Sequence, residues 1–96
     1  MLQTIIDAIH NRRALAFTYS GIARVVEPHA VGVSRAGNDA LRCFQTQGGH
    51  VTPGHEWDFC DLSQIIGLHA TGDVFSGARP DYRKGDKHMK HIYAEL

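Results

Sequence analysis

The first residues of the chain carry apolar side chains at the spacing of an amphipathic helix. One helical face, with positions i, i+3, i+4 and i+7, is apolar: Leu2, Ile5, Ile6 and Ile9. Arg12 and Arg13 come next, where positive charge suits the C-terminal end of a helix. The pattern predicts a short helix over residues 3–12. Because so short a helix is marginal alone, we expect it to dock on the rest of the chain.

From residue 15 the hydrophobic period changes to two. Leu15, Phe17 and Tyr19 alternate with small or polar residues, which is the pattern of a half-buried strand. Further strand-like stretches lie at residues 22–27 with 30–33, 40–47, 57–60 and 66–70. Pro28 ends or bends the second of them. Short strands at this spacing predict a mainly β fold, a five-stranded barrel rather than a βαβ sheet.

The composition shifts towards the C-terminus. Residues 76–87 hold almost no apolar side chain beyond Tyr82, which indicates a surface segment. Helical spacing then returns: Met89, Ile92, Tyr93 and Leu96. We therefore expect flanking helices at both ends. The single domain would comprise a barrel with its N-terminal helix over residues 1–75, and a polar basic linker with a C-terminal helix or arm over residues 76–96.

Length and composition restrict the class of protein. With 96 residues, 43% of them hydrophobic, the chain can form one core and one domain. The N-terminus has no secretory signal pattern, so a cytoplasmic location is expected. Cys43 and Cys60 fit no CxxC spacing and lie in apolar, strand-like contexts. Two buried thiols in a reducing compartment are the favoured interpretation, with a disulfide between neighbouring strands as the alternative.

The charges balance overall but not along the chain. Ten Lys and Arg offset ten Asp and Glu, so bulk electrostatic coating of nucleic acid is not expected. Residues 79–91 are mainly basic, whereas residues 56–73 contain acidic side chains and no Lys or Arg. A net charge of zero is therefore compatible with a local basic site.

A basic and aromatic set on the early strands is the first candidate site: Tyr19, Arg24, His29, Arg42 and Phe44. Guanidinium groups bind phosphate or carboxylate through paired hydrogen bonds, and an aromatic ring can stack on a base. The set predicts a non-catalytic site for a nucleotide or another small anion. The alternative is that each arginine merely lies on the solvent face of a half-exposed strand.

A second set suggests contact with single-stranded nucleic acid or a protein partner: Arg12, Arg13, Arg79, Tyr82, Arg83, Lys84 and Lys87. The alternative is a solvated tail, or one that pairs with the acidic segment of the same or another subunit. Edge strands and the apolar C-terminal stripe also favour a homodimer.

Seven histidines raise the further alternative of a metal-dependent enzyme. His50 and His55 flank one loop, and His88 and His91 share a face of the expected C-terminal helix. Neither HExxH nor a Cys–His zinc spacing is present, and nucleophile and phosphate-loop motifs are lacking. We therefore expect no catalytic residues, no metal and no cofactor.

Three stretches also carry a resemblance to a known family: AIHNRRALAFTY over residues 8–19, RVVEPH over residues 24–29 and FCDLSQI over residues 59–65. The chain resembles the WYL domain family over about residues 5–75. It departs from the family pattern near residues 39–42, where the Trp-Tyr-Leu tripeptide is absent, and at Gln64, where many members have arginine. The resemblance implies an Sm-like or SH3-like barrel. It also implies ligand sensing in transcription regulation, here as a stand-alone domain without the usual helix-turn-helix.

Overall fold

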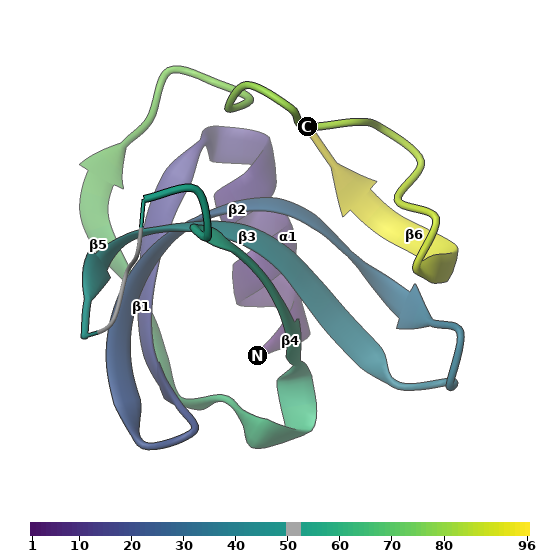
Figure 1. The fold of residues 1–96 in the computed structure, drawn as a ribbon, viewed down its shortest axis with the longest axis horizontal. Helices are drawn as coiled ribbons and strands as arrows, with labels where there is room; N and C mark the ends of the chain where they lie inside the picture. The colour runs from purple at the N-terminus through teal and green to yellow at the C-terminus, as the bar shows by residue number, and fades with distance from the viewer. Residues whose placement is uncertain (50–52) are drawn as a thin grey trace.

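The structure is a computed structural model that describes residues 1–49 and 53–96. In these two ranges the chain forms one α-helix, one 3-10 turn and six strands (Figure 1). In chain order they are α1 (Leu2–Asn11), β1 (Arg13–Tyr19), β2 (Ile22–Ser34), β3 (Asp39–Gly48), β4 (Trp57–Asp61), η1 (Leu62–Gln64), β5 (Ile66–Val74) and β6 (Met89–Glu95).

The strands form one antiparallel sheet in the order β4-β3-β2-β1-β5, with β6 on β2 outside this path. The 13-residue strand β2 organises the sheet, because β3 follows one of its edges while β1 and β6 share the other. The register of β2 against β3 shifts between Pro28 and Ala30, where proline has no N–H to donate. The long strands curl strongly around this region (Figure 1).

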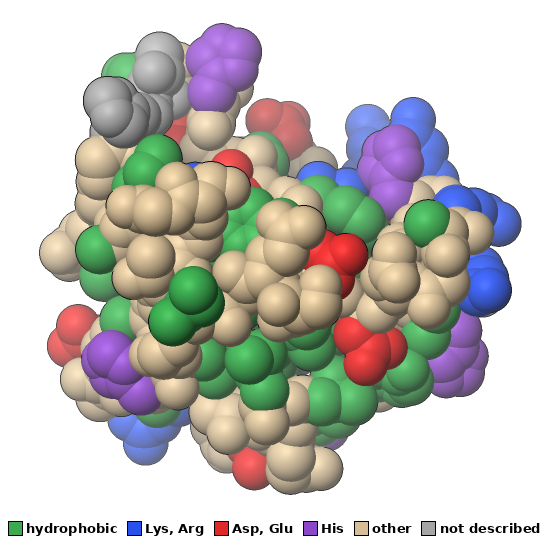
Figure 2. Space-filling model, turned by 90° about the horizontal axis from the view of Figure 1, so that it is seen from below, with side chains coloured by type: hydrophobic (Ala, Val, Ile, Leu, Met, Phe, Trp, Pro, Cys, Tyr) green, Lys and Arg blue, Asp and Glu red, His purple; other side chains and the backbone are tan. Residues whose placement is uncertain are grey.

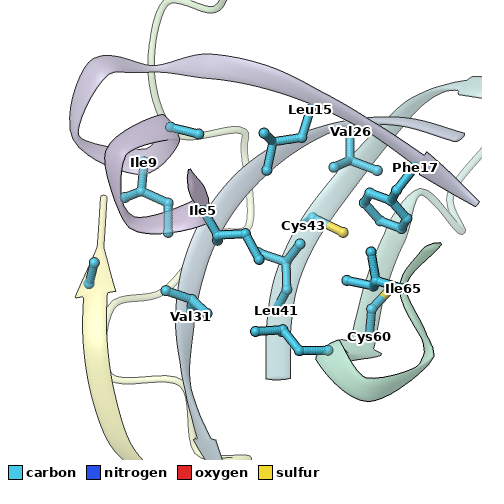
Figure 3. Packing of buried hydrophobic residues seen from close by; sticks show 13 residues of the cluster. Ile5, Ile9, Leu15, Phe17, Val26, Val31, Leu41, Cys43, Cys60 and Ile65 are labelled. Carbon is cyan, nitrogen blue, oxygen red and sulfur yellow. The ribbon is translucent and has the colours of Figure 1, made fainter. Parts of the chain in front are cut away.

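The core lies between α1 and the concave side of the curled sheet. The helix buries Ile5, Ala8 and Ile9, whereas its opposite face is exposed. The sheet contributes inward residues from several strands: Leu15, Phe17, Val26, Val31, Leu41, Cys43 and Cys60. Figure 3 shows these side chains pointing into the space between helix and strands. The helix that is marginal alone is therefore stabilised by docking, as its apolar stripe predicts.

The two cysteines lie within this core as free thiols. Their strands are neighbours, with Cys43 of β3 opposite Asp58 and Cys60 of β4 opposite Leu41. A hydrogen bond with Cys60, together with burial, raises the pKa of Cys43 well above its ordinary value. The Cys43 thiol therefore stays protonated and packs as a small apolar side chain, as the favoured interpretation expects.

The sequence predicts the first helix and five of the strands in their correct order, and a mainly β architecture is confirmed. The expected C-terminal helix is wrong, because Met89–Glu95 forms β6 along the second half of β2. The register of β6 against β2 shifts twice, so its inward residues do not alternate strictly. The resulting apolar spacing resembles that of a helix. The segment is a strand because it pairs with the free edge of β2.

Candidate functional site

The segment that connects β5 to β6, residues 75–88, arches over one end of the sheet and contacts side chains of β2 and β3 (Figure 1). We call it the strap. Arg79 anchors it to β2 with two hydrogen bonds of 2.7 and 3.0 Å to the Glu27 carboxylate. The same guanidinium lies 4.4 Å from the ring centre of Phe44. A second ion pair of 2.7 Å joins Asp86 of the strap to Arg42 of β3.

The strap contributes two rings to a larger cluster, which we call the aromatic cluster: His29, Phe44, Trp57, Phe75 and Tyr82. The His29 ring lies at its centre, with ring-centre distances of 4.8 Å to Trp57 and 4.9 Å to Tyr82. His29 is fully buried, where the irregular pairing of β2 beside Pro28 places it. The cluster acts as a second, smaller core that holds the strap against the sheet.

The hydrogen bonds of His29 define its protonation state. The backbone N–H of Arg79 donates to Nε2 at 3.1 Å, so Nε2 carries no proton. Nδ1 then holds the single ring proton and donates it to the carbonyl oxygen of Glu27 at 2.9 Å. Burial lowers the pKa of His29 and outweighs the opposite effect of Glu27. The neutral imidazole is therefore part of the folded structure.

A hollow of about 410 Å³ opens beside the cluster, lined by Arg42, Trp57 and residues 81–88. We call it the strap hollow. The rings of Trp57 and Tyr82 lie nearly parallel in its wall, 6.2 Å apart at an interplanar angle of 22°. Burial, followed by the charges of Glu95 and Asp86, raises the pKa of Tyr82 to about 12, so its phenol stays neutral. One wall of the hollow is therefore aromatic and uncharged.

The rim of the strap hollow carries three exposed cations and one exposed carboxylate, Asp81. Arg83, Lys84 and Lys87 are exposed there, and none of them forms an ion pair with any residue that the structure describes. Arg42 lies deeper, stacked 4.5 Å from the ring centre of Phe59 and paired with Asp86. The hollow thus combines flat rings with cations, which is the chemistry of an aromatic anion site.

A second hollow of about 510 Å³ adjoins the first, since Arg42 and His88 line both. It extends towards the turn between β2 and β3, and we call it the turn hollow. Tyr19 and Phe59 contribute its rings and Arg35 contributes a cation. Arg35 also donates from Nε to the backbone oxygen of Lys87 at 3.0 Å, which joins the turn to the strap.

The five residues of the first predicted site do not share one pocket. Arg24 pairs with Asp58 at 3.2 Å and does not line the strap hollow. His29 and Phe44 belong to the aromatic cluster under the strap, where His29 is inaccessible. Of the five, Arg42 alone lines the strap hollow, and Tyr19 lines the turn hollow. The set is divided because carboxylates of the same chain pair with Arg24 and Arg42, and because His29 is an interior residue.

The second predicted set is also divided. Tyr82, Arg83, Lys84 and Lys87 line the strap hollow, whereas Arg79 is an anchor that pairs with Glu27. Arg12 ends α1 in the left-handed conformation, with φ 52°, and Arg13 follows it outside both hollows. Arg79 of the strap pairs with Glu27, and the strap's own Asp86 pairs with Arg42, so among the described residues neither ion pair of the strap involves a carboxylate of residues 56–73.

The sequence pattern did not single out Trp57, although it contributes the largest ring of the site. Alternation with Asp58 predicts a strand there, but it does not show which face carries the strap. His50 lies outside the described residues. Within the described ranges no group of three or more His, Cys, Asp or Glu side chains is placed to hold a metal. In the same ranges no helix is long and apolar enough to cross a membrane.

Comparison with protein-family models, with curated proteins and with solved structures finds no match to this chain. The resemblance to the WYL family therefore stays a prediction from the sequence. The class of protein that fold and site define is a mainly β domain with a basic, aromatic hollow under a strap.

Proposed function

We propose that this protein is a non-catalytic binding module for a nucleotide-sized aromatic anion, which it holds in the strap hollow. The observation that carries the proposal is the pair of parallel rings, Trp57 and Tyr82, beside the exposed cations Arg83, Lys84 and Lys87. A base would stack on the rings while its phosphates contact the cations. The WYL resemblance adds the expectation of a regulatory context and an Sm-like or SH3-like barrel.

The size and chemistry of the strap hollow suit such a ligand. Its volume of about 410 Å³ lies within the usual range for small-molecule sites. Stacking on one aromatic side chain contributes about 1–3 kcal/mol per base. The lysines are exposed, so their contribution should weaken as salt screens them.

The test uses three probes: ADP, adenosine and inorganic pyrophosphate, titrated by calorimetry. We expect ADP to bind more tightly than either of its parts, because it engages both rings and cations. Replacing Lys84 and Lys87 together by alanine should weaken ADP and pyrophosphate about tenfold, the factor for 1.4 kcal/mol, and adenosine little. Lys90→Ala is the matched control, since Lys90 is an exposed cation outside the strap hollow. Unchanged ADP binding by the double variant would refute the site.

One observation favours single-stranded nucleic acid as a second candidate. The strap hollow and the turn hollow adjoin at Arg42 and His88, so a longer anion could follow both. Figure 2 shows Lys and Arg side chains gathered on the right, the side where β6 and the β2–β3 turn lie in Figure 1. An oligothymidine should then displace ADP, with an affinity that falls steeply with salt. Binding of ADP without any oligothymidine binding would reject this candidate.

A further inference from the structure

We propose that His29 is a proton-operated latch for the strap: protonation of its Nε2 releases the strap from the sheet and opens the strap hollow. The release itself depends only on the geometry around His29. Its effect on a ligand rests on the proposed function. The latch would make the same site sensitive to mild acidification.

The strap contacts His29 through hydrogen bonds and through ring packing. The Arg79 backbone N–H donates to the ring at 3.1 Å, and the Tyr82 hydroxyl donates to the His29 carbonyl oxygen at 3.3 Å. The rings of Phe75 and Tyr82 also pack on the imidazole, with ring-centre distances of 5.9 and 4.9 Å. The Arg79 bond is the contact that requires an unprotonated Nε2.

A proton taken up from solvent by the Nε2 lone pair turns that acceptor into a donor. The ring N–H then faces the N–H of Arg79, and the amide loses its buried partner. The Arg79 amide is half-buried, so loss of this bond costs up to about 1–3 kcal/mol and favours a strap whose amide contacts water instead. The proton leaves again to solvent when the pH rises, so the step is reversible.

The charges around His29 strengthen this effect. On β2 the Glu27 carboxylate lies near enough to act on the charge of the ring, and on the strap the Arg79 guanidinium does so. An imidazolium would repel Arg79 and compete with it for Glu27, which weakens the strap's ion pair. The rings packed on the imidazole add no charge, because Tyr82 is a neutral phenol and Trp57 and Phe75 do not titrate. Directly after β6 the backbone N–H of Leu96 donates to the His29 carbonyl oxygen at 2.8 Å. Both anchors near Arg79 would therefore fail together.

Release at Arg79 changes the strap hollow, because residues 81–88 form most of its lining. Tyr82 would leave the side of Trp57, which removes the parallel ring pair. The Arg42–Asp86 ion pair lies further along the strap and does not involve His29. We therefore expect the strap to hinge about this pair rather than detach completely.

The chain offers an internal reporter, since Trp57 is its only tryptophan and touches both His29 and Tyr82. Acidification from about pH 8 to about pH 5, across the range where histidines titrate, should shift Trp57 emission to the red. The Arg79 amide should lose protection in an NMR titration with the same midpoint as the His29 ring. In His29→Gln the emission should stay constant. His69→Gln is the matched control, because exposed His69 makes the same ring contact with a carbonyl two residues earlier but does not touch the strap.

The outcomes separate the latch from the proposed function. An Arg79 amide that stays protected while the His29 ring titrates overturns the latch, even if His29→Gln fails to fold. ADP titrations at both pH values complete the test. If the Trp57 and Arg79 signals follow His29 but ADP binds at neither pH, the latch is supported and the proposed function is refuted. If ADP binds and neither signal follows His29, the latch alone is refuted.

Discussion

Three arginines of this protein each lie between an aromatic ring and a carboxylate. The trios are Arg24 with Tyr19 and Asp58, Arg42 with Phe59 and Asp86, and Arg79 with Phe44 and Glu27. Interleaved basic and aromatic residues in the sequence predict ligand chemistry, but the same chemistry also suits contacts within the chain. The cations that are exposed at the strap hollow come from the strap, where Tyr82 lies among them in the sequence.

The Arg42–Asp86 ion pair should limit how tightly the strap hollow binds an anion, because Asp86 neutralises Arg42. Burial alone would raise the pKa of Asp86, but hydrogen bonds from Arg42 and the His88 amide hold it below its ordinary value. In Asp86→Asn the amide oxygen can still accept from His88, while Arg42 loses its counter-charge. We expect pyrophosphate to bind several-fold more tightly, measured by calorimetry at low salt. Asp81→Asn makes the same charge change in the same hollow without an arginine partner. An equal gain in both variants would show that Arg42 plays no special part.

At the scale of elements, the sequence predicts the helix and strands whose pattern of apolar residues is set by residues nearby in the chain. Alternation predicts β1 to β5, and the apolar stripe predicts α1, because each pattern reports burial on one face. β6 could not be recognised in this way, since its conformation depends on an edge of β2 that β1 leaves free beyond Val26. Long-range pairing overrides local spacing there.

The approach of β6 to β2 depends on Gly32. A Cβ at this position would collide with the backbone oxygen of His91 and lie 2.9 Å from the Cα of Ile92. Gly32→Ala should therefore separate the two strands and cost about 1–3 kcal/mol, the usual range for overpacking. Urea denaturation measures this loss. Gly49→Ala is the control, because among the described residues its added Cβ would meet the Ile22 side chain at an ordinary 3.7 Å. Equal stability of the two variants would contradict a close strand contact at Gly32.

At the scale of the whole molecule, the site is assembled from segments that are distant in the sequence. Arg79 meets Glu27 across 52 positions, and Asp86 meets Arg42 across 44. The strap folds onto the sheet because the aromatic cluster and two ion pairs stabilise it there. Composition predicts a polar surface segment for residues 76–87, but it does not reveal which sheet face lies beneath. The sequence thus predicts the strap's own contribution, Tyr82 with Arg83, Lys84 and Lys87, but not that Arg42 and Trp57 join it.

The buried neutral His29 also predicts how global stability depends on pH. Its pKa lies below the ordinary 6.5 in the folded chain, so between these two values the unfolded chain binds more protons. The free energy of unfolding should therefore be constant with respect to His29 above about pH 6.5 and fall as the pH drops towards the folded pKa. Each unit of difference corresponds to about 1.4 kcal/mol. Asp86 acts in a separate, more acidic window, because its lowered pKa contributes stability that is lost only below its ordinary 3.8.

Urea denaturation between about pH 7.5 and about pH 5.5 isolates the histidine window, since Asp86 stays ionised throughout it. The wild-type chain should lose stability over this range, and His69→Gln should lose as much, because His69 is exposed on β5. His29→Gln should start less stable, having lost its contact with the Arg79 amide, but its stability should change less with pH. The two variants are compared by the change of the free energy of unfolding with pH, because any core substitution lowers its absolute value. Parallel slopes in the wild type and His29→Gln would mean that protonation of His29 does not cause the loss of stability at low pH.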